Sequence, residues 1–177
     1  MIRRAALLLL MAVTPALAEV PEPQGYRGEP YSAPVPATLA GAEVIDAERA
    51  GALHDAGVAF VDAYPRRRRP EGLPEGTVWN EPRHDTIPGA LWLWDTGYQQ
   101  LSDAEQARLT DGLAQATAGD GSAPVVIFCR ADCWMSWNAA KRALGMGYSQ
   151  VKWFPGGTDD WVQVLGRELV RAEPVAP

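Results

Sequence analysis

Apolar positions along the chain fall into short continuous runs that alternate with segments expected to be helical. The clearest run, Val125–Phe128, is opened by Pro124 and has the pattern of a strand that is covered on both faces. The segment 136–146 that follows predicts a helix with Gly147 as its stop. Further strands are expected over 43–45, 58–63, 90–94 and 151–154, and further helices over 47–56, 102–118 and 158–165.

Two of the predicted helices carry clear start signals. Asp46 is placed to cap the first, and Ser102 with Glu105 forms a capping box for the second. Strands and helices that alternate through short links predict a single α/β domain over residues 39–168, with a parallel sheet and helices on both faces. In such sheets the reactive site lies outside the carboxyl ends of the strands.

The segments that flank this domain have a different character. Residues 1–18 predict a secretory signal peptide, because Arg3 and Arg4 precede an apolar stretch that ends in the small-residue signal Ala16-Leu17-Ala18. Residues 19–38 are rich in proline and predict an extended arm, while residues 169–177 predict a loose tail. We therefore expect an exported protein that leaves no membrane span after cleavage and works in an oxidising periplasm.

Charge narrows the range of partners. The chain has 16 basic and 22 acidic residues, a net charge of −6, which argues against nucleic acid or anionic lipid as its main partner. The irregular segment 64–86 nevertheless contains four consecutive arginines, 66–69. This run is either a solvated loop or an electrostatic handle for an acidic partner such as a dehydrogenase or cytochrome.

The chain has two cysteines, and the first is expected just after the Val125–Phe128 strand and before a helix. Backbone N–H groups and the helix dipole favour negative charge at such a position, so Cys129 is a candidate thiolate nucleophile. We expect loop amides and the helix amino end to stabilise that anion. The alternative is that Cys129 is a small buried apolar residue.

Three residues separate Cys133 from Cys129, which is close enough for the Cα separation of about 4.4–6.8 Å that a disulfide requires. So short a loop would gain only about 2 kcal/mol from chain entropy, which favours a resolving or redox thiol over a passive staple, without excluding the staple. A metal site is disfavoured, because His54 and His84 are the only histidines and neither has ligand spacing with the pair.

Four landmarks in order resemble the rhodanese domain over roughly residues 42–165. They are Phe60-Val-Asp62, Ile87-Pro-Gly-Ala90 with His84 upstream, Cys129 itself, and Gly147-Tyr148 followed by Gly156-Gly157 and Trp161. More narrowly, the stretch from Cys129 to Trp134, with Gly156-Gly-Thr-Asp-Asp-Trp161, resembles the exported "CXXCW motif" family. That family is associated with catabolism dependent on pyrroloquinoline quinone (PQQ).

The resemblance implies an active-site loop that contains both cysteines. The other loop residues are then Arg130, Ala131, Asp132, Trp134, Met135 and Ser136, and the supporting residues are Asp62, His84 and Trp137. We expect Asp132 at the rim, Trp134 exposed and Trp137 in the core. The arginine that active rhodaneses carry late in this loop is missing, and with it the bidentate anion capture that phosphatase chemistry would need.

Two functions remain open at this point. One is a sulfurtransferase-like or thiol–disulfide reaction on a small sulfur-containing or thiol substrate, in which a Cys129 thiolate or persulfide is resolved by Cys133. The other is a non-catalytic binding module that assists a PQQ dehydrogenase or its c-type cytochrome partner. Neither requires a bound cofactor, because the implied association with PQQ is indirect.

Overall fold

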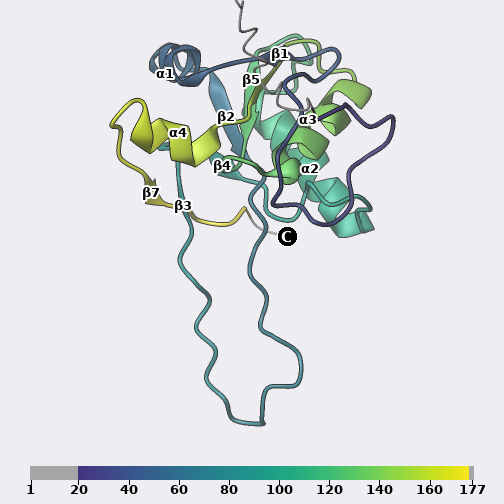
Figure 1. The fold of residues 1–177 in the computed structure, drawn as a ribbon, viewed down its shortest axis with the longest axis vertical. Coiled ribbons are helices and arrows are strands. Elements are labelled where there is room, and N and C mark those ends of the chain that lie inside the picture. The colour runs from purple at the N-terminus through teal and green to yellow at the C-terminus, as the bar shows by residue number, and fades with distance from the viewer. Residues whose placement is uncertain (1–19, 176–177) are drawn as a thin grey trace, which may run out of the picture.

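The computed structural model describes residues 20–175, so the predicted signal peptide lies outside the described residues. Its centre is a five-stranded parallel sheet with the order β1-β6-β5-β2-β4 (Figure 1). The strands are β1 (Glu43–Val44), β2 (Ala59–Asp62), β4 (Leu91–Trp92), β5 (Val125–Phe128) and β6 (Val151–Phe154). The helices are α1 (Ala47–Asp55), α2 (Asp103–Ala116), α3 (Trp134–Gly145) and α4 (Gly157–Gln163). The predicted α/β architecture is confirmed.

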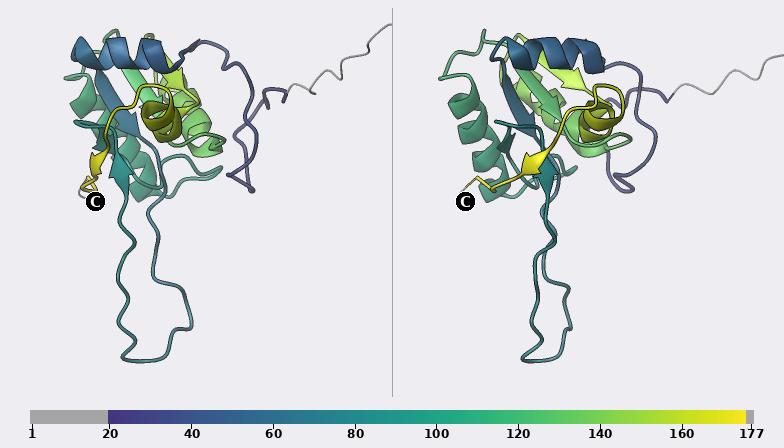
Figure 2. Two further views of the ribbon diagram at one scale, coloured as in Figure 1. Left: turned by 60° about the vertical axis from the view of Figure 1, so that its left-hand side comes forward. Right: turned by 90° about the vertical axis from the view of Figure 1, so that its left-hand side faces the viewer.

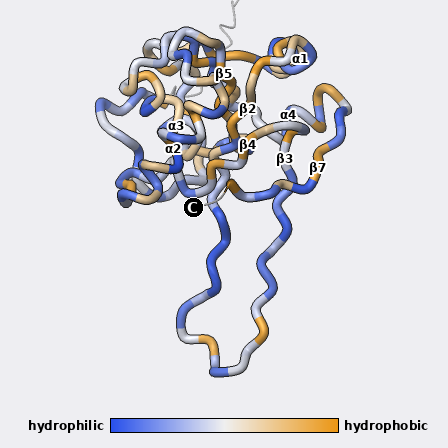
Figure 3. The backbone as a smooth tube through the Cα atoms, turned by 180° about the vertical axis from the view of Figure 1, so that it is seen from behind, coloured by the Kyte–Doolittle hydropathy of each residue, from blue (hydrophilic) through white to orange (hydrophobic). Residues whose placement is uncertain are grey.

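Helices cover both faces of the sheet, and side chains of β5 alternate between the two layers (Figures 1 and 2). Val125 and Ile127 pack with α2 and α3, while Val126 and Phe128 pack with α1 and α4. All four side chains are fully buried, which explains the uninterrupted apolar run in the sequence. The hydrophobic colouring of Figure 3 is strongest along these central strands.

The helix signals work largely as expected. Asp46 accepts a hydrogen bond from the Arg49 amide, and Ser102 with Glu105 forms the predicted capping box. The main departure is α3, which begins two residues before the predicted start, at Trp134. Trp134 therefore lies on the same helix face as Trp137 and packs edge-on against it, so it is 3 % exposed rather than at the surface.

The segment after Glu168, expected to be loose, is paired with the domain as far as the structure describes it. Strand β7 (Val170–Arg171) forms an antiparallel pair with β3 (Asp85–Thr86). Farther on, the Val175 amide donates to the Trp92 carbonyl over 3.3 Å. None of the helices within residues 20–175 is long and apolar enough to cross a membrane.

The N-terminal arm lies against α3 rather than away from the domain. Asn138, fully buried on that helix, accepts from the Arg27 amide over 2.9 Å and donates to the Arg27 carbonyl over 2.8 Å. The same side-chain amide also donates to the Gly97 carbonyl over 2.7 Å. One buried side chain thus completes the backbone hydrogen bonding of two separate segments.

Residues 66–83 form a long projection, which we call the finger, that extends away from the sheet and helices (Figures 1 and 2). It contains no helix or strand and is mostly hydrophilic (Figure 3). Loops of this length within a compact domain are usually functional.

We predict that Asn138→Ala weakens the attachment of the arm. Three hydrogen bonds disappear and buried backbone groups are left without partners, at about 1 kcal/mol each, so the free energy of unfolding should fall by about 3 kcal/mol. Denaturant unfolding and limited proteolysis of the arm measure the effect. The control, Thr110→Ala at an exposed position of α2, should change little. An Asn138→Ala protein as stable and as protease-resistant as the parent would contradict this role.

Candidate active site

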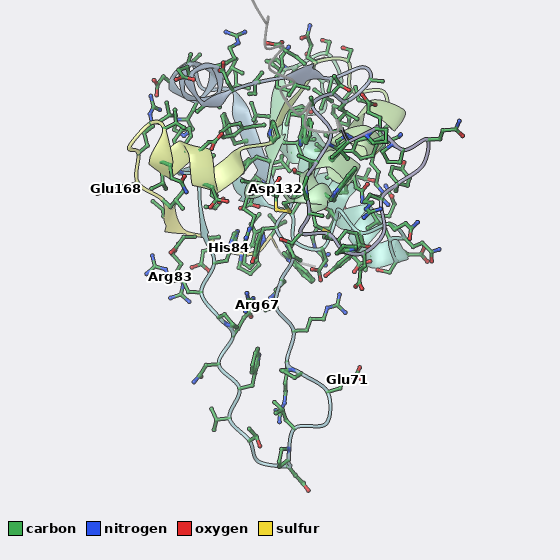
Figure 4. The ribbon with its side chains drawn as sticks, in the orientation of Figure 1. Arg67, Glu71, Arg83, His84, Asp132 and Glu168 are labelled. Atoms are coloured by element: carbon green, nitrogen blue, oxygen red, sulfur yellow. A yellow bond between two sulfur atoms is a disulfide. The ribbon has the colours of Figure 1, made fainter. Side chains whose placement is uncertain are left out.

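The two cysteines lie at the carboxyl end of β5, where the fold places its reactive site. Cys129 follows Phe128 directly, and its sulfur is joined to that of Cys133 in a disulfide with a Cα separation of 6.2 Å (Figure 4). Cys129 is 1 % exposed and Cys133 is 7 % exposed. The pair is therefore oxidised and nearly enclosed, and Cys133 is the more exposed of the two residues.

One side of the loop is held by the start of α4. The Cys129 carbonyl accepts a hydrogen bond from the Thr158 amide over 3.0 Å, and the Ala131 amide donates to Asp159 Oδ2 over 2.9 Å. Between these contacts, Gly157 has a φ of 51° and pairs with Arg130. A Cβ at Gly157 would lie 2.3 Å from the Cys129 carbonyl oxygen, so the loop requires glycine here.

The other side of the loop is held by the arm. Ser32 pairs antiparallel with Cys133, through hydrogen bonds from the Ala33 amide to the Asp132 carbonyl (3.0 Å) and from the Trp134 amide to the Tyr31 carbonyl (2.9 Å). The Tyr31 hydroxyl accepts from the Gln99 amide over 3.1 Å. The arm, which lies about a hundred residues away from the cysteines in sequence, thus completes the site.

These contacts change the expected electrostatics of the loop. The Ala131 and Trp134 amides, expected to stabilise an anion, donate to a carboxylate and to a carbonyl instead. The Asp159 carboxylate also brings a negative charge to the loop. Two of the amides expected to face an anion are therefore occupied, and the carboxylate of Asp159 disfavours further negative charge nearby.

A pocket of about 120 Å³ opens beside Cys133. Cys129 does not line it. The single charged group of its wall is the guanidinium of Arg130, an exposed residue. Asp132 is exposed, with a φ of 52°, and does not line this pocket. The lining residues are Tyr31, Ser32, Tyr64, Pro65, Arg130, Cys133 and Met135.

Asp62 and His84 form a second cluster behind this wall. The fully buried Asp62 carboxylate accepts from the Tyr64 amide (2.8 Å) and the Thr86 hydroxyl (2.6 Å), and lies 2.8 Å from His84 Nε2. The His84 ring stacks on Tyr64 at 4.5 Å. Asp62 thus anchors both ends of the segment that carries the finger, and His84 reaches the cysteine pocket only through Tyr64.

The remaining predicted residues support the loop from inside. Ser136, buried on α3, donates to the Cys133 carbonyl over 3.0 Å and accepts from Trp153 Nε1 over 3.1 Å. Trp137 is in the core, as predicted. Sequence reasoning missed Tyr31, Tyr64 and Asp159, since no local pattern marks their approach to the cysteines. No cluster of metal-ligating side chains occurs in the part of the chain that the structure describes.

We predict that Gly157→Ala disturbs the cysteine loop beyond the ordinary cost of a left-handed residue. The matched control is Gly166→Ala, where φ is 63° and nothing lies within 4 Å of the added Cβ. The control should lose about 1–2 kcal/mol of stability and Gly157→Ala about 1–3 kcal/mol more, as measured by denaturant unfolding. Equal losses would show that the close contact with Cys129 does not constrain the loop.

The rhodanese-like domain family model matches residues 46–164. Among solved structures, a human single-domain sulfurtransferase, TSTD1, shares 23 % sequence identity with a TM-score of 0.40, covering 69 % of this chain and 96 % of that one. No curated protein matches the chain closely enough to count as a relative. The chain belongs to the rhodanese-like domain family.

Proposed function

We propose that this rhodanese-like protein carries out thiol–disulfide exchange through the Cys129–Cys133 pair, as a periplasmic accessory of PQQ-dependent catabolism. The observation that carries the proposal is the asymmetry of the disulfide, in which Cys133 lines an open pocket while Cys129 is enclosed. We therefore assign Cys133 as the sulfur that exchanges with substrate and Cys129 as the resolving sulfur, the reverse of the roles expected from sequence.

The exchange step follows from this arrangement. An incoming thiolate attacks the Cys133 sulfur, a new S–S bond forms to the substrate, and the bond to Cys129 breaks. The electron pair leaves on the Cys129 sulfur, which takes a proton from solvent or attacks the mixed disulfide in return. A second substrate thiol that attacks the mixed disulfide completes reduction of the pair and leaves the substrate as a disulfide.

The position of Cys133 suits a reactive sulfur. It is the N-cap residue of α3, and its side chain makes no capping hydrogen bond in the oxidised state. Once reduced, a sulfur at an N-cap can accept from amides of the first helical turn, here those of Met135 and Ser136. We expect this to lower the pKa of the reduced Cys133 thiol below its ordinary value of about 8.5.

The surroundings favour thiols over anionic sulfur donors. The amides of Ala131 and Trp134 already donate to other acceptors, and Asp159 adds negative charge to the loop. Sulfur transfer through a persulfide would first require reduction of the disulfide, because the oxidised pair contains no thiolate. We therefore expect slow turnover of thiosulfate and faster reaction with thiols or protein disulfides.

The wider setting of the proposal rests on the N-terminal sequence and on the resemblance to the CXXCW family. Residues 1–18 have the pattern of an export signal, and the periplasm is a compartment in which a disulfide persists. On this proposal, the partner is a PQQ dehydrogenase or its c-type cytochrome, with no PQQ bound by this chain. The alternative, a non-catalytic binding module, is supported by the projecting finger.

We predict that the two single-cysteine proteins differ in reactivity. Cys129→Ser leaves the pocket-facing Cys133, whereas Cys133→Ser leaves the enclosed Cys129. At neutral pH the former should be alkylated by iodoacetamide at least about tenfold faster, because it is both more accessible and nearer the helix amino end. Mass spectrometry over a series of times and pH values measures both rates.

The control for intrinsic reactivity is the same pair of proteins in denaturant, where the rates should converge. Faster alkylation of Cys129 in the folded state would reverse the assigned roles. If both thiols react only after unfolding, the pair is structural and the binding-module alternative gains support.

A further inference from the structure

We propose that the finger and the hollows at its base form a docking groove for an acidic polypeptide that presents a cysteine to Cys133. The inference rests on the proposed exchange reaction and adds the chemical class of its partner. Three observations support it: ion pairs fix the base of the finger, two of its arginines are unpaired among the described residues, and neighbouring hollows share lining residues.

The finger is fixed at its base by ion pairs. Arg66 forms a two-point contact with Glu81 on the opposite limb, with nitrogen–oxygen distances of 2.7 and 2.8 Å. Arg68 donates to the buried carboxylate of Asp95 over 2.9 Å and to Glu105 at 3.2 Å. The two limbs are thereby held to each other and to the domain, so the surface between them is preorganised.

Alternate arginines of the same run are free to bind something else. Arg67 and Arg69 are exposed and form no ion pair with any carboxylate of residues 20–175. Figure 4 shows Arg67 at the base of the finger, near His84 and Arg83, and Glu71 farther toward its end. The run thus uses two guanidinium groups to fix the finger and leaves two for a partner.

Three hollows lie in sequence between this surface and the cysteine pair, and each shares lining residues with the next. The largest, about 670 Å³, lies between the finger and the start of α2, and Arg67 is shared with a second hollow of about 230 Å³. The second shares Tyr64 and Pro65 with the pocket that contains Cys133. The three together are lined by seven arginines, 66–69, 83, 108 and 130, against two glutamates, 81 and 105.

The floor of the largest hollow has the chemistry of a binding hot spot. Arg108 is 5 % exposed, its guanidinium lies 3.3 Å from the Trp94 ring centroid, and its Nε has no hydrogen-bond partner among the described residues. Trp79 of the finger lines the same hollow. Arginine and tryptophan are the residues that most often dominate protein interfaces.

The shape favours a polypeptide over a small anion. A ligand that contacts the free arginines and also reaches Cys133 must extend past Tyr64 and Pro65, through all three hollows. The basic lining, in a chain of net charge −6, would attract an acidic partner and orient it along this path.

The test uses the oxidised protein and defined thiols. Two peptides of equal length contain one cysteine each, and glutamate residues in one are glutamine in the other. For each peptide, the rate at which it reduces the Cys129–Cys133 disulfide is divided by the rate at which it reduces a neutral small-molecule disulfide. The ratio corrects for any difference in thiol pKa between the two peptides. At low ionic strength the glutamate peptide should react at least about tenfold faster, and about 0.5 M salt should abolish the difference.

The matched variants are Arg67→Glu and Arg49→Glu, which change charge equally. Arg49 lies on α1, at the opposite end of the molecule from the finger (Figure 1). Arg67→Glu should remove most of the advantage of the glutamate peptide and Arg49→Glu should retain it. Equal rates for the two peptides, or equal losses in the two variants, would overturn the docking groove.

Two small thiols distinguish failure of the exchange reaction from failure of the polypeptide assignment. 2-Mercaptoethanol should reduce the pair in the unaltered protein; a failure to react at all would overturn the exchange reaction itself, rather than the groove. The dianionic thiol mercaptosuccinate should gain little from Arg67. If it gained as much as the glutamate peptide, the occupant would be a small anion and the polypeptide assignment would be wrong.

Discussion

The backbone hydrogen bonds on both sides of the Cys129–Cys133 loop are the contacts on which the rest of the site depends. On one side Thr158 and Asp159 bind the start of the loop, and on the other Tyr31 and Ala33 bind its end. Two amides of a loop fixed this way, those of Ala131 and Trp134, are occupied and do not face a ligand. On the proposed function, the reactive side of the disulfide is then Cys133, which lines the pocket.

The family fold is therefore used in a modified way. The parallel sheet still delivers Cys129 to the carboxyl end of β5, but its sulfur is bonded to Cys133, and the arm pairs with Cys133. On the proposed function, the reactive position is Cys133, the N-cap residue of α3. The finger beside this position, anchored through Asp62 and by Arg66 and Arg68, provides a basic approach to it. The cysteine pocket and the hollow at the base of the finger share Tyr64 as a lining residue, so the two features adjoin.

Local sequence patterns were sufficient to predict the strands and helices that position the cysteine loop. The apolar runs predicted β5 and β6 residue for residue, and the capping residues predicted where α1 and α2 begin. The paired tail, the buried Trp134 and the occupied amides could not be predicted, because each depends on a partner far along the chain. The Trp134 amide binds the Tyr31 carbonyl and the Val175 amide binds the Trp92 carbonyl, and neither pair leaves a periodic trace in the sequence. Gly156-Gly157 was used only as a landmark of the family resemblance, and the close approach of Gly157 to the Cys129 carbonyl was not predicted.

The assignment of Cys133 as the exchanging sulfur is tested most directly by trapping the mixed disulfide. The oxidised protein would be mixed with glutathione, quenched with acid, and digested so that mass spectrometry locates the glutathione. The account predicts glutathione on Cys133 with Cys129 free as a thiol. Glutathione predominantly on Cys129 would contradict it, and would return the reactive role to the sulfur at the end of β5.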